Sequence, residues 1–135
     1  MTRRFFALVL VASLGAVACG GTDTAVEPRF ETVTASAFAD IVNSAAAGLV
    51  ILDVRTPDEF GAGHIAGAVN LDFEAESFRS QLEGLAKDVP YAVYCRSGNR
   101  SAQAAAIMQE LGFSDVRELG GGIITWLEAG YPIEG

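Results

Sequence analysis

The spacing of hydrophobic residues changes repeatedly along this 135-residue chain, and the changes separate two kinds of segment. Short continuous apolar runs, such as "LVIL" at 49–52, are bounded by glycine or polar residues. Runs of that length and setting indicate strands that are buried on both faces. Strands are therefore predicted within segments 30–33, 48–55, 68–71, 91–95 and 115–120.

Between the strands, hydrophobic residues recur at helical spacing, and capping residues mark where helices begin. Phe78, Leu82 and Leu85 share one helical face. Thr56, followed by Pro57 and then Glu59, is typical of a helix start. Helices are accordingly predicted after a cap at Thr34 or Ser36, after Thr56, and within segments 76–85, 101–113 and 121–132.

This alternation of strands and helices predicts an α/β fold, with a mainly parallel five-stranded sheet and helices on both faces. No repeat or second domain is visible, so residues 30–135 are expected to form one domain. In such sheets, ligands bind beyond the carboxyl ends of the strands. Asp53 and Arg55 end one strand and Cys95 ends another, which predicts that all three lie along the same edge of the sheet.

Residues 1–18 have a different pattern, in which Arg3 and Arg4 precede an apolar run that ends at Ala18. The run is short for a membrane-spanning helix. Its layout is typical of a secretory signal peptide, and a short N-terminal membrane anchor is the alternative interpretation.

Cys19 follows directly, and "GGTDTAVEP" after it has no apolar periodicity. The arrangement resembles a bacterial lipoprotein signal, although Ala16 stands where such signals usually have leucine. The resemblance implies a lipidated Cys19, a flexible tether over 19–29, and an extracytoplasmic domain anchored to a bacterial membrane. Ordinary cleavage after Ala18, which would leave a secreted or soluble periplasmic protein, is the alternative.

The composition argues against several classes of partner. Seventeen acidic residues against nine basic ones give a net charge of -8, and loss of Arg3 and Arg4 with the signal would bring it to about -10. Nucleic acids and anionic lipid headgroups both attract clustered cations, so neither is expected as a partner, and contact with a membrane would run through the lipid anchor. With one histidine, His64, and one thiol left after lipidation, no metal site and no cofactor are expected.

The loop after Cys95, "RSGNRS", combines features that favour an anion. Gly98 permits the positive φ that turns successive N–H groups inward. The helix predicted to begin near Ser101 adds free N–H groups and the positive end of its dipole. Two arginines add positive charge. We therefore expect an anion-binding loop around Cys95 that consists of Arg96, Ser97, Gly98, Asn99, Arg100 and Ser101.

Cys95 is the candidate nucleophile. A free thiol has a pKa of about 8.5, which helix N-termini and neighbouring arginines lower to about 3.5–7.5. This setting predicts a thiolate at neutral pH that attacks an electrophile and carries the transferred group. A buried, inert cysteine is the alternative, and a cysteine–histidine pair would require the fold to bring His64 close.

Loop length distinguishes two families of cysteine enzymes. Cysteine phosphatases place five residues between the cysteine and the arginine, whereas Cys95 and Arg100 have four between them. The shorter loop resembles that of the rhodanese family. Two further motifs, "LDVRTPDEFGAGHIAGAVNL" and "LGGGIITWLEAGYPI", resemble the same family and stand in the same order. The resemblance covers roughly residues 30–133.

The resemblance implies a sulfurtransferase with the rhodanese-like fold. Cys95 would take the outer sulfur of an anionic donor such as thiosulfate, release sulfite and hold the sulfur as a persulfide. Cyanide, another thiol or a sulfur-acceptor protein would then receive it. The alternatives are a non-catalytic rhodanese-homology module that binds sulfide, persulfide or a protein partner, and a phosphatase-like enzyme, which the short loop disfavours.

Further residues are expected to support the loop rather than to react. Asp53 is placed to bind N–H or guanidinium groups, and Arg55 with Glu59 to form an ion pair that holds the helix start. His64 is expected to hydrogen-bond to loop backbone, with a role as a base as the alternative. Arg100 is expected to contact the substrate or the loop anion rather than to form a surface ion pair.

Overall fold

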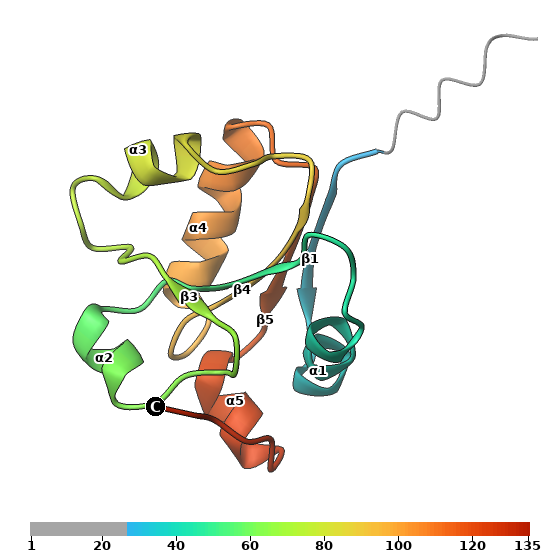
Figure 1. Cartoon of the computed structure of the whole chain (residues 1–135), viewed down its shortest axis with the longest axis vertical. Helices are drawn as coiled ribbons and strands as arrows, with labels where there is room; N and C mark the ends of the chain where they lie inside the picture. Colours follow the sequence, from blue (N-terminus) through green and yellow to red (C-terminus); the bar gives the residue numbers. More distant parts are fainter. Residues whose placement is uncertain (1–26) are drawn as a thin grey trace, which may run out of the picture.

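The structure, a computed structural model, describes residues 27–135, so the predicted signal peptide and Cys19 lie outside the described residues. Its centre is a five-stranded, all-parallel sheet with the strand order β1-β5-β4-β2-β3 (Figure 1). The predicted architecture is thereby confirmed. In chain order the elements are β1 (Arg29–Val33), α1 (Ala35–Asn43), β2 (Val50–Asp53), α2 (Pro57–Gly61), β3 (Val69–Asn70), α3 (Phe78–Glu83), β4 (Pro90–Tyr94), α4 (Asn99–Glu110), β5 (Asp115–Leu119) and α5 (Gly122–Glu128).

Helices cover both faces of the sheet, and each face has its own buried cluster (Figure 1). Leu82 of α3 and Met108 of α4 belong to the first cluster. Phe38 of α1 and Trp126 of α5 belong to the second, and their rings meet edge to face with centroids 6.1 Å apart. Strands β2 and β4 are thus covered on both sides, which explains why they read as continuous apolar runs.

Capping residues set the start of two helices. The Thr56 hydroxyl accepts a hydrogen bond from the Glu59 N–H over 3.3 Å, and Pro57 occupies the first turn of α2, as predicted. Helix α1 is capped by Thr34, whose hydroxyl accepts from the N–H three residues on, and not by Ser36. In both cases a side-chain oxygen satisfies an N–H group that has no partner inside the helix.

Helix α4 begins at Asn99, two residues before the predicted start near Ser101. Gly98 occupies the cap position with a φ of 99°, in the left-handed region that glycine enters without steric cost. The helix ends as predicted, with Gly112 just beyond it at a φ of 87°. The earlier start places the first turn of α4 inside the loop that follows Cys95.

The register between β2 and β4 determines which side chains meet at the carboxyl edge. Asp53 pairs with Tyr94, and the Val54 N–H donates to the Tyr94 carbonyl over 3.0 Å. The chain therefore leaves both strands at the same edge. Arg55, two residues after β2, and Cys95, directly after β4, therefore lie along one edge of the sheet, as the sequence predicted.

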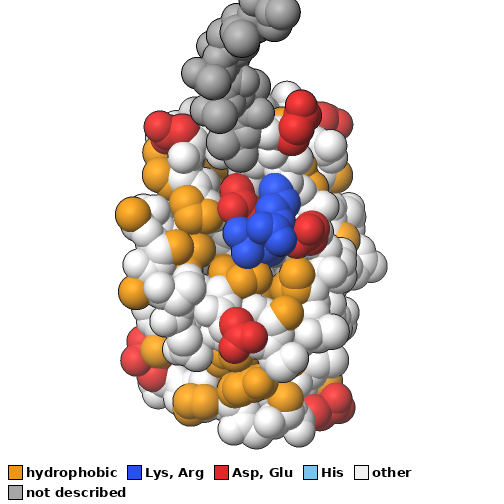
Figure 2. Space-filling model, turned by 90° about the vertical axis from the view of Figure 1, so that its right-hand side faces the viewer, with side chains coloured by type: hydrophobic (Ala, Val, Ile, Leu, Met, Phe, Trp, Pro, Cys, Tyr) orange, Lys and Arg blue, Asp and Glu red, His pale blue; other side chains and the backbone are white. Residues whose placement is uncertain are grey.

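Figure 2 shows one face of the molecule, on which basic side chains gather in a small group bordered by acidic ones. The edge strand β1 and its neighbour β5 each carry one ion pair, Arg29 with Glu31 and Arg117 with Asp115. Opposite charges thus lie side by side on these strands. No helix within residues 27–135 has the length and apolar character needed to cross a membrane.

Candidate active site

Cys95 follows β4 directly and lies beneath the loop that the sequence singled out. It is 1% exposed and forms no disulfide. The Gly98 N–H donates to its sulfur over 3.0 Å, and the Ser101 hydroxyl lies 3.4 Å from the same atom. The sulfur is therefore enclosed by the loop, with a backbone donor directed at it.

Free backbone N–H groups accompany that donor. Three of them belong to the first turn of α4, where N–H groups have no partner within the helix. Together with the positive end of the α4 dipole, they form an environment suited to an anion next to the sulfur. Within residues 27–135, the loop N–H groups that donate to no protein acceptor are those of Arg96, Ser97, Asn99, Arg100 and Ser101.

The N-terminus of α5 holds the first peptides of the loop. The Ile123 N–H donates to the Cys95 carbonyl over 2.9 Å, and the Ile124 N–H donates to the Arg96 carbonyl over 3.2 Å. Gly122, with a φ of 63°, approaches the Arg96 carbonyl so closely that a Cβ atom would collide with it. Sequence reasoning gave this glycine no role, and the run of three glycines before a helix was the available signal.

A buried carboxylate behind the loop was also missed. Glu118 of β5 is 6% exposed, and the Ser101 hydroxyl donates to its Oε2 over 2.6 Å. The Thr32 hydroxyl donates to the other oxygen, Oε1, over 2.8 Å. Ser101 therefore links the Cys95 sulfur to a carboxylate in the sheet. The available signal was a charged residue inside a strand predicted to be buried on both faces.

The two arginines of the loop differ in their contacts. Arg100 donates to both carboxylate oxygens of Glu59, over 3.2 and 2.9 Å, so the structure shows the ion pair that was the less favoured expectation. The hydrogen bond to Glu59 raises the pKa of Arg100, and the charge of Cys95 adds to this. Arg96 is exposed and forms no ion pair among the described residues. Arg96 is thus the loop cation that is open to a substrate.

The prediction of an ion pair between Arg55 and Glu59 is wrong. Arg55 instead pairs with Asp53, at 2.6 Å between Nη2 and Oδ2, and also donates to the Gly63 carbonyl over 2.7 Å. Residues two apart on an extended chain point to the same side, which makes Asp53 the nearer partner. Burial would lower the pKa of Arg55, but the hydrogen bond and charge of Asp53 more than offset it, so this pKa lies above its usual value.

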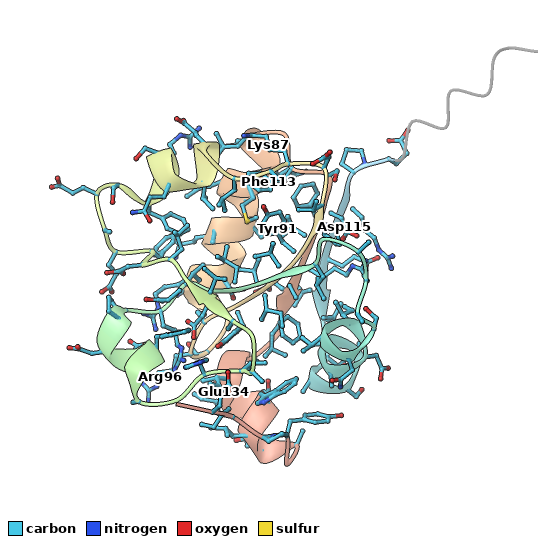
Figure 3. The ribbon with its side chains drawn as sticks, in the orientation of Figure 1. Lys87, Tyr91, Arg96, Phe113, Asp115 and Glu134 are labelled. Carbon is cyan, nitrogen blue, oxygen red and sulfur yellow. The ribbon has the colours of Figure 1, made fainter. Side chains whose placement is uncertain are left out.

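His64 lies beside α2. Its Nδ1 is 3.0 Å from the Phe60 carbonyl, and its ring stacks on the Phe60 ring with centroids 3.8 Å apart. The contact is to backbone, as predicted, but the carbonyl belongs to helix α2 rather than to a loop. Its main chain also exchanges two hydrogen bonds with Glu134, which lies at the same end of the molecule as Arg96 (Figure 3). Within the described part of the chain, no hydrogen bond or ion pair joins His64 to Cys95.

The assembled site brings together the Cys95 sulfur, a set of backbone N–H groups without protein acceptors and one exposed cation, Arg96. A thiolate in this position can attack an electrophile and retain the transferred group. The N–H donors can stabilise negative charge on an atom bound to the sulfur. Between residues 27 and 135, the structure shows no group of three or more His, Cys, Asp and Glu side chains arranged to hold a metal ion.

Comparison with known proteins connects this geometry to a family. Residues 34–129 match the model of the family described as Rhodanese-like domain. Thiosulfate sulfurtransferase GlpE from Pseudomonas putida is 42% identical over 87 residues, which cover 64% of this chain and 76% of that protein.

Solved structures agree on the fold. A rhodanese-related protein from Thermoplasma volcanium has a TM-score of 0.65 and 33% identity, covering 77% of this chain and 97% of its own. A protein of unknown function from Rhodopseudomonas palustris, described as a possible tyrosine phosphatase, has a TM-score of 0.63 and 34% identity, covering 78% of this chain and 85% of its own. Because the family model spans most of the described residues and a relative shares 42% identity, this chain belongs to the rhodanese-like domain family.

Proposed function

We propose that this protein is a sulfurtransferase that carries sulfane sulfur as a persulfide on Cys95, with thiosulfate or a similar anion as the donor. Family membership and the similarity to a protein named thiosulfate sulfurtransferase support the general activity. The observation that carries the proposal is the Gly98 N–H at 3.0 Å from the buried Cys95 sulfur, accompanied by free N–H groups of the same loop.

In the proposed reaction, the Cys95 thiolate attacks the outer sulfur of thiosulfate. A new S–S bond forms while the S–S bond of thiosulfate breaks, and sulfite leaves with the electron pair. The outer sulfur of the resulting persulfide is negatively charged, and the free loop N–H groups stabilise that charge. A cyanide ion or a thiolate, including one on an acceptor protein, then attacks the outer sulfur and releases Cys95 as a thiolate.

Arg96 is the residue proposed to attract the donor. It is exposed, whereas Arg100 is occupied by Glu59. In a protein with a net charge of -8, a cation next to the reactive sulfur counteracts the repulsion that an anionic donor would meet. Arg100, through Glu59, is proposed to hold the loop against α2.

Intact-mass measurement after incubation with thiosulfate tests the proposal. The wild-type protein is expected to gain the mass of one sulfur atom and to lose it when cyanide is added. Cys95→Ser, which retains Cys19, is the matched control and is expected to gain nothing. No gain by the wild type, together with hydrolysis of an aryl phosphate, would assign the site to the phosphatase alternative. A sulfur that is bound but never passed on would assign it to a non-catalytic module.

We further propose, from the sequence of residues 1–19, that the protein is exported and anchored by a lipid on Cys19. Metabolic labelling with a fatty-acid analogue in a bacterial host tests this. The label is expected in the wild type and in Cys95→Ser, and to be lost in Cys19→Ala, because the chain has only these two cysteines. A label that survives Cys19→Ala would contradict the lipoprotein assignment.

A further inference from the structure

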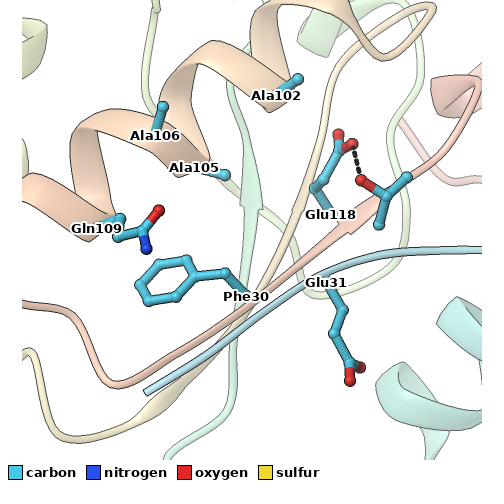
Figure 4. A pocket seen from close by; sticks show the side chains of 8 residues that line it. Phe30, Glu31, Ala102, Ala105, Ala106, Gln109 and Glu118 are labelled. Atoms are coloured by element: carbon cyan, nitrogen blue, oxygen red, sulfur yellow. Dashed lines mark hydrogen bonds between the residues drawn. The ribbon is translucent and has the colours of Figure 1, made fainter.

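Glu118 is a buried carboxylate whose partners carry no positive charge. It is 6% exposed, and its two oxygens accept hydrogen bonds from the hydroxyls of Thr32 and Ser101 (Figure 4 shows the Thr32 bond as a dashed line). Among residues 27–135, no lysine or arginine pairs with it. Removing a carboxylate from water without a cation costs several kcal/mol or more in free energy.

Few titratable groups face Glu118 from the elements around it. On β1, Glu31 is directed away from it (Figure 4). On β5, the neighbouring Arg117 forms its ion pair with Asp115. The residues of α4 that line the hollow beside Glu118 are uncharged: Ala102, Ala105, Ala106 and Gln109. The titratable group to which Glu118 is connected is Cys95, at the end of β4, and the connection runs through Ser101.

The Ser101 hydroxyl has one hydrogen, and besides Glu118 and Cys95 the Gly98 carbonyl lies 3.2 Å from its oxygen, so it can donate to only one of these three neighbours at a time. In the structure its oxygen is 2.6 Å from Glu118 Oε2 and 3.4 Å from the Cys95 sulfur. The short bond to the carboxylate takes the hydrogen, which leaves a lone pair facing the sulfur. Ser101 can then accept a hydrogen bond from the neutral thiol. Once Glu118 is protonated and no longer accepts the Ser101 hydrogen, Ser101 can donate to a thiolate instead.

We propose that Glu118 is a positioning residue that receives the proton of Cys95 through Ser101. The S–H bond of Cys95 breaks and its proton moves to Ser101 Oγ, while the original hydroxyl hydrogen of Ser101 moves to Glu118 Oε2. The products are a thiolate and a neutral carboxylic acid, and no outside base is required. Ser101 then donates its hydrogen toward the sulfur, alongside the Gly98 N–H. This proposal rests on the reactive thiolate of the proposed function.

The hollow next to Glu118 provides a route to solvent for the same proton. It has a volume of about 200 Å³, lies between β1 and α4, and has no wall residue from the loop 95–101 (Figure 4). The proton therefore leaves through the hollow between β1 and α4, whereas the sulfur donor and the sulfur acceptor reach Cys95 through the loop. The two paths do not compete for space at Cys95.

The pH dependence of Cys95 alkylation by iodoacetamide tests the proposal, because it requires no sulfur donor. Two titratable groups that share a proton are expected to give a two-step profile, with partial reactivity after the first step. Glu118→Gln keeps the size and the hydrogen-bond acceptor but cannot take a proton. We expect a single step at higher pH, and alkylation at about pH 6 slowed about tenfold, the factor that one pKa unit gives.

The opposite result would overturn the proposal. If Glu118 stays ionised and merely repels the thiolate, the glutamine removes a negative charge near the sulfur, and alkylation at the same pH becomes faster. An unchanged two-step profile would also contradict the relay. Thr32→Val is the matched control, since it removes the other hydrogen bond to Glu118 and leaves Ser101 in place, and its profile is expected to keep two steps.

Ser101→Ala tests the relay independently if the glutamine variant does not fold. It retains Glu118 but removes the bridging hydroxyl, and the low-pH step is expected to disappear; persistence of that step would contradict the role of Ser101. Circular dichroism verifies that each variant is folded. A wild-type protein that shows two steps but gains no sulfur from thiosulfate would refute the proposed sulfurtransferase activity and support the relay. A wild-type protein that shows a single step but gains sulfur would refute the relay and support the activity.

Discussion

Asp53 is completely buried, and its carboxylate accepts hydrogen bonds from both the backbone N–H and the guanidinium of Arg55. The Asn70 amide donates to the carbonyls of the same two residues. Arg55 in turn donates to the Gly63 carbonyl, so the ion pair connects the end of β2 to the loop after α2, and Asn70 connects β3 to the same two residues. Such a pair contributes little compared with apolar packing, but removing one partner leaves an uncompensated buried charge.

Asp53→Asn is therefore expected to lower the free energy of unfolding by about 3–5 kcal/mol, because the Arg55 charge remains buried without its counter-ion. Urea denaturation measures this difference. Glu31→Gln is the control, since its pair with Arg29 is about half exposed, and its loss is expected to stay below about 1 kcal/mol. Equal losses of unfolding free energy in the two variants would contradict the explanation that burial of the Arg55 charge causes the larger loss.

At the scale of elements, the active loop is held by the turn between β5 and α5. Gly98 and Gly121 approach so closely that a Cβ on Gly98 would be 3.1 Å from the Gly121 nitrogen. The N–H groups at the start of α5 bind the carbonyls of Cys95 and Arg96. The loop after β4 thus owes its shape to a segment more than twenty residues further along the chain.

Gly122→Ala is expected to disturb this junction, because its Cβ would meet the carbonyls of Cys95 and Arg96. The displaced loop is expected to form the Cys95 persulfide about 10- to 100-fold more slowly, as measured by intact mass over time. Gly130→Ala is the matched control: Gly130 also has a positive φ, of 84°, but has open space around it. It should lose about 1–2 kcal/mol of stability and keep the wild-type rate; equal slowing in both variants would contradict the junction.

The elements themselves could be predicted because their signals are local. Thr56 and Pro57 mark the start of α2 through contacts within one turn, and the strands are marked by their own apolar runs. The start of α4 was misplaced by two residues because it depends on the cap geometry of Gly98, which is packed against Gly121. A contact with a distant segment leaves no periodic pattern near the residue that it constrains.

At the scale of the whole molecule, Tyr94 ties the sheet to the loop beside α2. It is fully buried at the end of β4, its hydroxyl accepts the Ile65 N–H over 3.0 Å, and the Arg55 guanidinium lies 5.6 Å from the centre of its ring. Burial raises the pKa of Tyr94 far above its usual value of 10.0, and the nearby Asp53 carboxylate raises it further. Burial also raises the pKa of Tyr91.

These shifts predict a loss of stability in alkaline solution. Below about pH 10 both the folded and the unfolded chain keep the Tyr94 proton, so its contribution is constant. Above that pH the unfolded chain releases the proton and the folded chain retains it, so the free energy of unfolding falls as pH rises. In Tyr94→Phe this fall is expected to be shallower, by up to about 1.4 kcal/mol per pH unit. Urea denaturation at several alkaline pH values measures it; an unchanged slope would contradict the assignment.

The fold class and the position of Cys95 at the carboxyl edge followed from sequence, because parallel strands end at the same side. The strand order could not be predicted, because an apolar run does not indicate which other strand it pairs with. The prediction that Arg55 pairs with Glu59 failed for the same reason, because the sequence does not indicate which charged residues the fold brings together. Glu59 lies next to Arg100 rather than Arg55 because the β2–β4 register brings the two loops together, and only the assembled sheet sets that distance.

If Cys95 reacts as proposed, the hydrogen bonds from α5 to the Cys95 and Arg96 carbonyls also determine when its thiol becomes reactive. During synthesis, β4 and its loop leave the ribosome before residues 120–124, so the loop cannot take its final shape until the later segment has docked. A partly made or partly unfolded chain would carry an ordinary cysteine. Fast alkylation of Cys95 would then report that the C-terminal part of the domain is in place, which makes the nucleophile an internal indicator of completed folding.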